Sequence, residues 1–193
     1  MISSNNTISR EMLDILALGR GKMLDAVLCT DLAGERQNTS FQVVVLRFTD
    51  FDIELWCEEQ PDRSGELSDL AKITVKRNDR KNVVSPLGKK DDNGYFTPLD
   101  FLPVSIGQKV LGITVCNEVV KAINKCGNIE FALENTRAVI ISVGDRFIHL
   151  EKQCHWSEIW RVQITTSPDI ETPSEWENDE DITYEVTSSA LQI

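Results

Sequence analysis

The sequence predicts an α+β fold that is mostly β, with two similar small antiparallel-sheet halves and an N-terminal helix. Apolar runs of strand length occur at 43–46 and 138–141. Apolar and polar residues alternate strictly from Phe51 to Leu55, as in a strand that faces the core on one side and water on the other. Two blocks, 22–29 and 109–116, resemble one another. These three observations define the expected architecture.

The helix is the first expected element. Its apolar residues recur at the spacing of one helical face: Ile8, Met12, Ile15 and Leu16. Thr7 or Ser9 can cap its start, and Gly19 can end it. Strand-like segments follow at 23–29, 41–46 and 48–56.

The two similar blocks indicate an internal duplication. Each block begins at a lysine and ends at a cysteine, and each is followed by a polar stretch and then a pair of strands. The chain divides accordingly into the helix with the first β-rich repeat at 1–85, a linker or loop at 86–104, a second β-rich repeat at 105–166 and an acidic tail at 167–193. Unrelated strand–loop–strand units would also look alike, so similarity without duplication stays open.

No segment has the length of a membrane helix, which needs roughly 18 to 20 continuous apolar residues. The N-terminus lacks the pattern of a signal peptide, because Asp14 interrupts its apolar segment. Five cysteines are spread along the chain without a C-x-x-C pair, which favours free thiols. We therefore expect a cytoplasmic protein that does not associate with membranes.

The net charge of −11 argues against nucleic-acid binding, because the average field of the protein would repel phosphates. Eight acidic residues lie in the tail, which has no Lys or Arg: Asp169, Glu171, Glu175, Glu177, Asp179, Glu180, Asp181 and Glu185. Seven basic residues lie between 72 and 90: Lys72, Lys76, Arg77, Arg80, Lys81, Lys89 and Lys90. Either stretch could be plain solvated surface, or the tail could bind a partner or fold back on the basic segment.

Catalytic and metal-binding templates are incomplete in this sequence. Ser142, Asp145 and His149 make a hydrolase triad only on paper, because Ser142 lies outside any Gly-x-Ser-x-Gly turn. Cys154 and His155 are adjacent, so in an extended chain they point to opposite faces and do not share a metal. We expect no enzyme activity, no cofactor and no metal.

Three segments carry a family resemblance: 107–115, 129–135 and 139–145. They are similar to segments of short, uncharacterised bacterial β-rich proteins, some of which resemble immunity proteins. The resemblance implies a non-enzymatic protein that neutralises a neighbouring toxin, and it places no residue in a catalytic role. An acidic protein of this type would bind a basic protein partner, since opposite charge speeds association and helps to select the partner.

The residues expected to contact such a partner are tail carboxylates and one aromatic anchor: Glu175, Trp176, Glu177, Asp179, Glu180 and Asp181. If partner binding is the role of the tail, deleting 168–193 should cost little fold stability. Two other functions stay open. One is a small-ligand-binding protein or enzyme with a pocket between the halves, and its candidate residues are Asp145, Cys154 and His155. The other is a homodimeric structural module paired through exposed strand edges.

Overall fold

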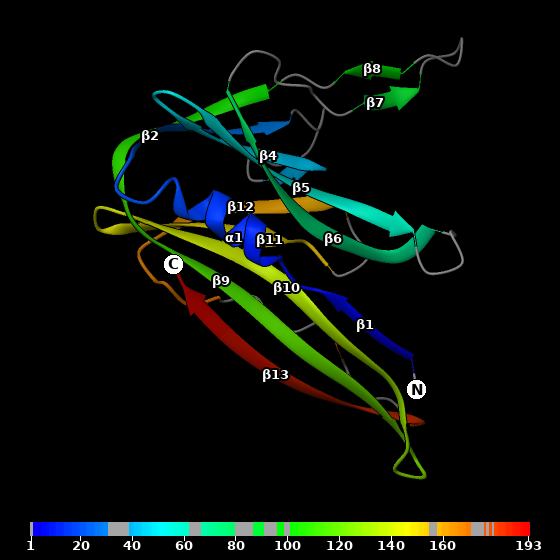
Figure 1. The fold of residues 1–193 in the computed structure, drawn as a ribbon. Helices are drawn as coiled ribbons and strands as arrows, with labels where there is room; N and C mark the ends of the chain where they lie inside the picture. Colours follow the sequence, from blue (N-terminus) through cyan, green and yellow to red (C-terminus); the bar gives the residue numbers. More distant parts are fainter. Residues whose placement is uncertain are drawn as a thin grey trace.

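The computed structural model describes residues 2–30, 39–61, 67–79, 87–90, 96–98, 101–154, 158–170, 176, 178 and 180–193. Over these ranges the protein is mostly antiparallel β-sheet with one short helix (Figure 1). The elements are β1 (Ile2–Asn6), α1 (Arg10–Ala17), β2 (Met23–Thr30), β3 (Thr39–Phe41), β4 (Val43–Phe48), β5 (Asp52–Pro61), β6 (Leu67–Asn78), β7 (Leu87–Lys90), β8 (Phe96–Pro98), β9 (Phe101–Asn124), β10 (Ile129–Val143), β11 (Arg146–Lys152), β12 (Ile159–Thr165) and β13 (Ile182–Gln192).

Eleven strands form one continuous sheet, along which the order is β3-β12-β11-β10-β9-β2-β4-β5-β6, with β1 beside β10 and β13 beside β9. The long strand β9 joins two parts of this sheet, because 101–109 pair with β2 and 110–123 pair with β10. We call β2, β4, β5, β6 and the first part of β9 sheet B. Sheet A is the second part of β9 with β1, β3 and β10 to β13. Strands β7 and β8 pair separately.

One hydrophobic core joins the two sheets. Leu46 and Ile53 from sheet B belong to the same buried cluster as Ile141 and Ile148 from sheet A, and all four are fully buried. Trp160 of β12 is buried in this cluster as well, and its Nε1–H donates to the carbonyl oxygen of Gln42 at 3.1 Å. This cluster therefore belongs to both sheets, while a smaller buried cluster of Ala26, Leu28, Val43 and Val45 belongs to sheet B.

The helix is short, and it is not the first element of the chain. Ser9 caps it, since the Ser9 Oγ accepts from the Met12 N–H at 3.3 Å, and Leu16 enters the core. The preceding strand β1 pairs in parallel with β10. Its Ser and Asn residues are poor strand formers, so the pairing edge of β10 rather than local preference accounts for β1. Among the described residues, α1 is the one helix, and it is not long and apolar enough to cross a membrane.

The structure does not confirm the two similar halves. Residues 22–56 contain β2, β3, β4 and part of β5, whereas 109–143 contain only the second part of β9 and all of β10. The two matched cysteines also differ, because Cys29 is buried and Cys116 is only partly buried. All five thiols are free, as expected, but only Cys29 and Cys57 are buried. Strand β9 is shared by both sheets, so the chain has no boundary between separate repeats there.

The expected linker and tail both contribute strands. The segment 86–104 includes β7, β8 and the start of β9. Within the segment 167–193, β13 pairs with β9 along its whole length in an uninterrupted register. Together with β1, this strand borders a long extension of β9 and β10 (Figure 1), which we call the arm. Residues 182–192 are thus part of sheet A.

A buried lysine ties the two sheets together. Lys152 of β11 is 6 % exposed, and its Nζ donates to the Ala71 carbonyl oxygen of β6 and to the Asn135 Oδ1 of β10, both at 2.8 Å. Burial of the ammonium group lowers the pKa of Lys152 to about 8. The folded state therefore binds this proton more weakly than the unfolded chain does.

The free energy of unfolding should consequently rise with pH through the Lys152 titration. Between the folded pKa near 8 and the usual lysine pKa of 10.5, the unfolded chain holds more protons, so alkaline pH favours the folded state. The expected gain is about 2 to 3 kcal/mol. Urea unfolding at pH 7.5 and pH 10 measures this gain in wild type and in Lys152→Met. Both proteins keep all five cysteines, so the difference between them removes most of the contribution of the cysteine titrations. An identical pH dependence in both proteins would contradict this assignment.

Candidate binding cleft

The candidate site lies on the face of sheet A that points away from the core, which we call the outer face. Strand alternation separates the two faces, since Ile148 and Leu150 of β11 enter the core while His149 and Glu151 point outward. The segment 166–170 crosses part of this face. A cleft of about 500 Å³ lies there, lined by residues of β9, β10, β13 and that segment.

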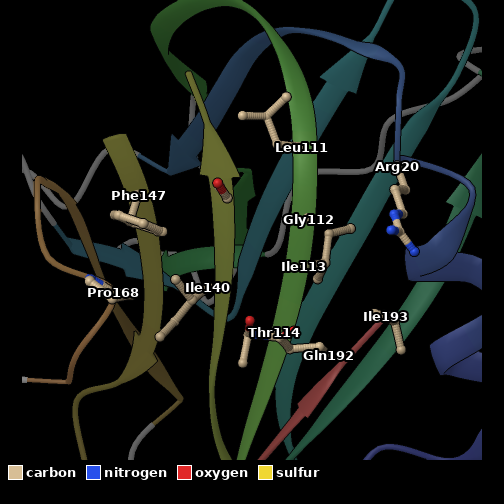
Figure 2. A pocket seen from close by; sticks show the side chains of 11 residues that line it. Arg20, Leu111, Gly112, Ile113, Thr114, Ile140, Phe147, Pro168, Gln192 and Ile193 are labelled. Carbon is tan, nitrogen blue, oxygen red and sulfur yellow. The ribbon is translucent and has the colours of Figure 1, made fainter. Parts of the chain in front are cut away.

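A second hollow of about 410 Å³ continues the cleft toward the loop after α1 (Figure 2). Both hollows are lined by Thr114, Ile140, Pro168 and Gln192, so they form one groove. Arg20 lies at the far end of this groove. The residues shared by the two hollows, among them Thr114, Ile140 and Gln192, lie on the outer face of sheet A. A pocket between the two halves, which the sequence left open as an alternative, stays a prediction.

An ion pair is built into the cleft wall. Glu118 of β9 is 2 % exposed, and its Oε1 accepts from the Nη1 of Arg137, whose side chain is 14 % exposed. Arg137 lies at a register shift in β10 between Thr136 and Ala138. An extra residue at such a shift can re-aim a side chain, which brings Arg137 beside Glu118 on the outer face. The cleft therefore contains a charged pair that is almost completely removed from water.

His149 fixes the segment that covers the cleft. It is 2 % exposed, and its Nε2–H donates to the Ser167 carbonyl oxygen at 2.9 Å. The Thr165 Oγ1 lies 3.2 Å from the same Nε2. Its Nδ1 lies 3.5 Å from the Glu151 Oε1. Both ring nitrogens of His149 therefore contact groups other than Ser142. Ser142, Asp145 and His149 do not form a catalytic triad. Asp145 is exposed in the turn between β10 and β11.

Cys116 is the thiol in the cleft. Burial raises its pKa above the ordinary thiol value, and the neighbouring Glu151 and Glu118 carboxylates act in the same direction, against the opposing effect of Arg137. At neutral pH the group is therefore a thiol, which is a poor nucleophile. Cys154 is partly buried, while His155 lies outside the described residues. No group of three His, Cys, Asp or Glu side chains suited to a metal ion occurs in the part of the chain that the structure describes.

The tail residues expected to bind a partner are placed in part. Trp176 packs against Phe131 of β10 and Tyr184 of β13. Its ring centroid lies 5.8 Å from that of Phe131 and 5.2 Å from that of Tyr184. Glu180 and Asp181 are exposed, and Asp181 forms an ion pair with Lys125 at 2.7 Å. The remaining three, Glu175, Glu177 and Asp179, lie outside the described residues. Trp176 is thus a packing anchor that holds this segment on the arm.

The described part of the tail lies on sheet A, whereas the described basic residues of 72–90 lie on β6 of sheet B and, for Lys89 and Lys90, on β7. Arg80 and Lys81 lie outside the described residues. Lys72, Lys76 and Arg77 belong to β6 of sheet B, where the Lys76 Nζ lies 5.2 Å from the centroid of the Trp56 ring. Trp176 contacts sheet A instead. The Trp176 anchor therefore does not lie on β6, where these three basic residues are.

Glu118, Arg137 and Asp169 were not predicted from the sequence as cleft residues. No motif joins them, and Glu118 and Arg137 come together only through the pairing of β9 with β10. One signal was present, because Glu118 lies between the apolar pairs 115–116 and 119–120, and Arg137 directly precedes the apolar run 138–141. Isolated charges of this kind are rarely buried without a partner. That pattern could have marked Glu118 and Arg137 as a pair.

No family model, no curated protein and no solved structure matches the chain.

Proposed function

We propose that the protein is a non-enzymatic, immunity-type binding protein that binds a basic protein partner on the outer face of sheet A. The main support is the charge of the cleft. In this cleft Glu118 is paired with Arg137, so the exposed carboxylate of Asp169 supplies the net negative charge, while Arg20 lies at the far end of the groove. An excess of negative charge in a partly enclosed cleft suits the lysine or arginine side chain of a partner.

The acidic tail adjoins this cleft. Tyr184 and Ala122 are register partners on the arm, and strand alternation puts them on the same face as Glu118 and Ser188, which line the cleft. Trp176 packs on Tyr184, so the segment that carries Glu180 is held on that face. The cleft and the segment that carries the exposed Glu180 thus share one face, which we call the acidic surface.

Negative charge on this surface would attract a basic partner before contact. The protein carries a net charge of −11, which attracts a cationic molecule over distances up to the Debye length, about 8 Å at physiological salt. The apolar residues of the groove, Ile140 and Pro168, then contact the aliphatic part of a long basic side chain. Affinity for such a partner should therefore fall as salt is added.

Two exposed carboxylates provide the test. The double variant Asp169→Asn/Glu180→Gln removes negative charge from the acidic surface, and Glu11→Gln/Asp50→Asn removes the same charge from exposed positions in α1 and the β4–β5 turn. With an oligoarginine peptide as the probe, fluorescence polarisation at low salt should show about tenfold weaker binding for the first variant. The control should stay within about twofold of wild type. Equal weakening by both variants would mean that overall charge, and not this surface, binds the peptide.

A further inference from the structure

The groove on the outer face carries opposite charges at its two ends. Arg20 lines the far hollow but not the cleft, and Asp169 lines the cleft but not the far hollow. Both residues are exposed, and Arg20 forms no ion pair with another described residue. Figure 2 shows Arg20 beside β9, on the side where β13 ends. Because Glu118 is paired with Arg137, the groove has an exposed guanidinium at one end and an exposed carboxylate at the other.

The floor between these ends is long enough for a short extended segment. From Gly112 in the far hollow to Glu118 in the cleft, β9 advances by six residues, or roughly 20 Å. The shared stretch of the groove combines apolar and polar side chains, among them Ile140, Thr114 and Gln192. Apolar groups can pack against a bound segment, and hydroxyl and amide groups can hydrogen-bond to its backbone.

Gly112 leaves part of this floor open. It pairs with Ser142 of β10, and both residues line the far hollow. A Cβ atom at Gly112 would meet no atom within 4 Å, so open space lies above it. Its φ is not positive, so the backbone conformation does not require glycine there. A glycine inside a strand can mark a place where another backbone approaches closely. The sheet is therefore accessible to a bound chain at this point.

We propose that this groove binds an extended segment of the partner, with a lysine or arginine at Asp169 and an aspartate or glutamate at Arg20, about six residues apart. The inference rests on the proposed function, because the basic residue of this segment is the one that enters the cleft. It describes the segment more narrowly, since the carboxylate at the far end is part of what the groove recognises.

The order of the charges gives the groove a means of selection. A segment with basic residues throughout places a like charge against Arg20, which weakens binding, whereas a segment with a carboxylate there gains an ion pair. The net charge of −11 attracts any cationic segment to the surface. The spacing of two opposite charges, rather than net charge alone, therefore determines which segment fits the groove.

Fluorescence polarisation at low salt with two labelled peptides of about seven residues tests this inference. Each peptide contains one arginine and one glutamate, so their net charges are equal. The first carries these residues at opposite ends, and the second carries them side by side at one end. Each is measured in both sequence directions, and the tighter direction is used. Wild type should bind the first peptide about threefold to fivefold more tightly than the second, as expected for one partly exposed ion pair.

Three variants locate the contacts. Arg20→Gln should abolish the preference for the first peptide and should bind oligoarginine at least as tightly as wild type does. Lys22→Gln is the matched control and should keep the preference, because Lys22 is an exposed cation of the same loop that does not line the groove. Gly112→Val fills the floor and should weaken binding of the first peptide about tenfold. Circular dichroism melts establish that each variant is folded.

Any of three results would overturn the extended segment. They are equal binding of the two peptides by wild type, loss of the preference in Lys22→Gln as well as in Arg20→Gln, and unchanged binding by folded Gly112→Val. If Asp169→Asn/Glu180→Gln still weakens oligoarginine binding in that case, the acidic surface stands and only the segment fails. If that double variant has no effect and neither peptide binds, the proposed function and the segment are both overturned.

Discussion

Replacing Arg137 by Met should destabilise the protein by about 3 to 5 kcal/mol. The reason is the burial of Glu118, which is 2 % exposed and accepts a hydrogen bond from the Arg137 guanidinium. Removing the cation takes the guanidinium partner from a carboxylate that is almost completely buried, and such a loss is costly. Urea unfolding at pH 7 followed by circular dichroism measures the loss.

Two comparisons separate the buried pair from a general effect of losing arginine. Arg10→Met removes an arginine whose ion pair with Asp14 is exposed, so its effect should stay below about 1 kcal/mol. The double variant Glu118→Met/Arg137→Met removes both charges and should recover most of the loss, since apolar residues can replace a buried pair. A double variant as unstable as Arg137→Met would show that shape, and not the orphaned carboxylate, sets the cost.

Deleting residues 182–193 should unfold the protein or destabilise it by at least about 3 kcal/mol. These residues include β13, whose pairing with β9 spans the whole strand. The deletion also removes Tyr184, which packs on Phe131 and Trp176. Because hydrogen bonds and apolar contacts supply this stability, the loss should change little between low and high salt in thermal melts. This outcome is the opposite of that expected for a tail that serves only to bind a partner.

A pair of point variants keeps this prediction testable if the truncated chain does not fold. Tyr184 is partly buried and lies in the aromatic cluster of the arm, whereas Thr183 is exposed on the other face of the same strand. Tyr184→Ala should cost about 1 to 3 kcal/mol, and Thr183→Ala should stay within about 0.5 kcal/mol of wild type. Equal, negligible effects of both variants would show that β13 contributes little to the fold.

The β-rich character of the fold could be predicted from local patterns. The alternation from Phe51 to Leu55 corresponds to part of β5, and the apolar runs at 43–46 and 138–141 lie in β4 and β10. Ser9 was one of two expected caps and is the one used. These features depend on neighbouring residues, so one sequence is enough to show them.

The parts that could not be predicted depend on pairing between distant segments. Strand β1 is polar and forms against the edge of β10. Its Asn5 pairs with Glu134, which lies 129 positions away in the sequence. The apparent duplication reflected two strand segments with similar apolar patterns, of which the second is the middle of β9. Local patterns do not show that β9 passes from one sheet to the other, so the chain looked like two halves.

The candidate site was predicted only in its acidic character. Trp176 was expected to contact a partner, and the structure packs it within the chain on Phe131 and Tyr184. Its role toward a partner stays a prediction. The cleft depends on the ion pair between Glu118 and Arg137 and on the placement of 166–170 across the outer face. Both are tertiary features, and the sequence carries no motif for either of them.

The most direct test of the proposed binding surface is an NMR titration of the ¹⁵N-labelled protein with the oligoarginine peptide. We expect the largest amide shifts on the cleft strands and the segment beside them, 114–118, 166–170 and 188–192, and we expect these shifts to diminish as salt is added. Shifts confined to β4, β5 and β6 of sheet B, or spread evenly over all exposed carboxylates, would contradict binding at the cleft.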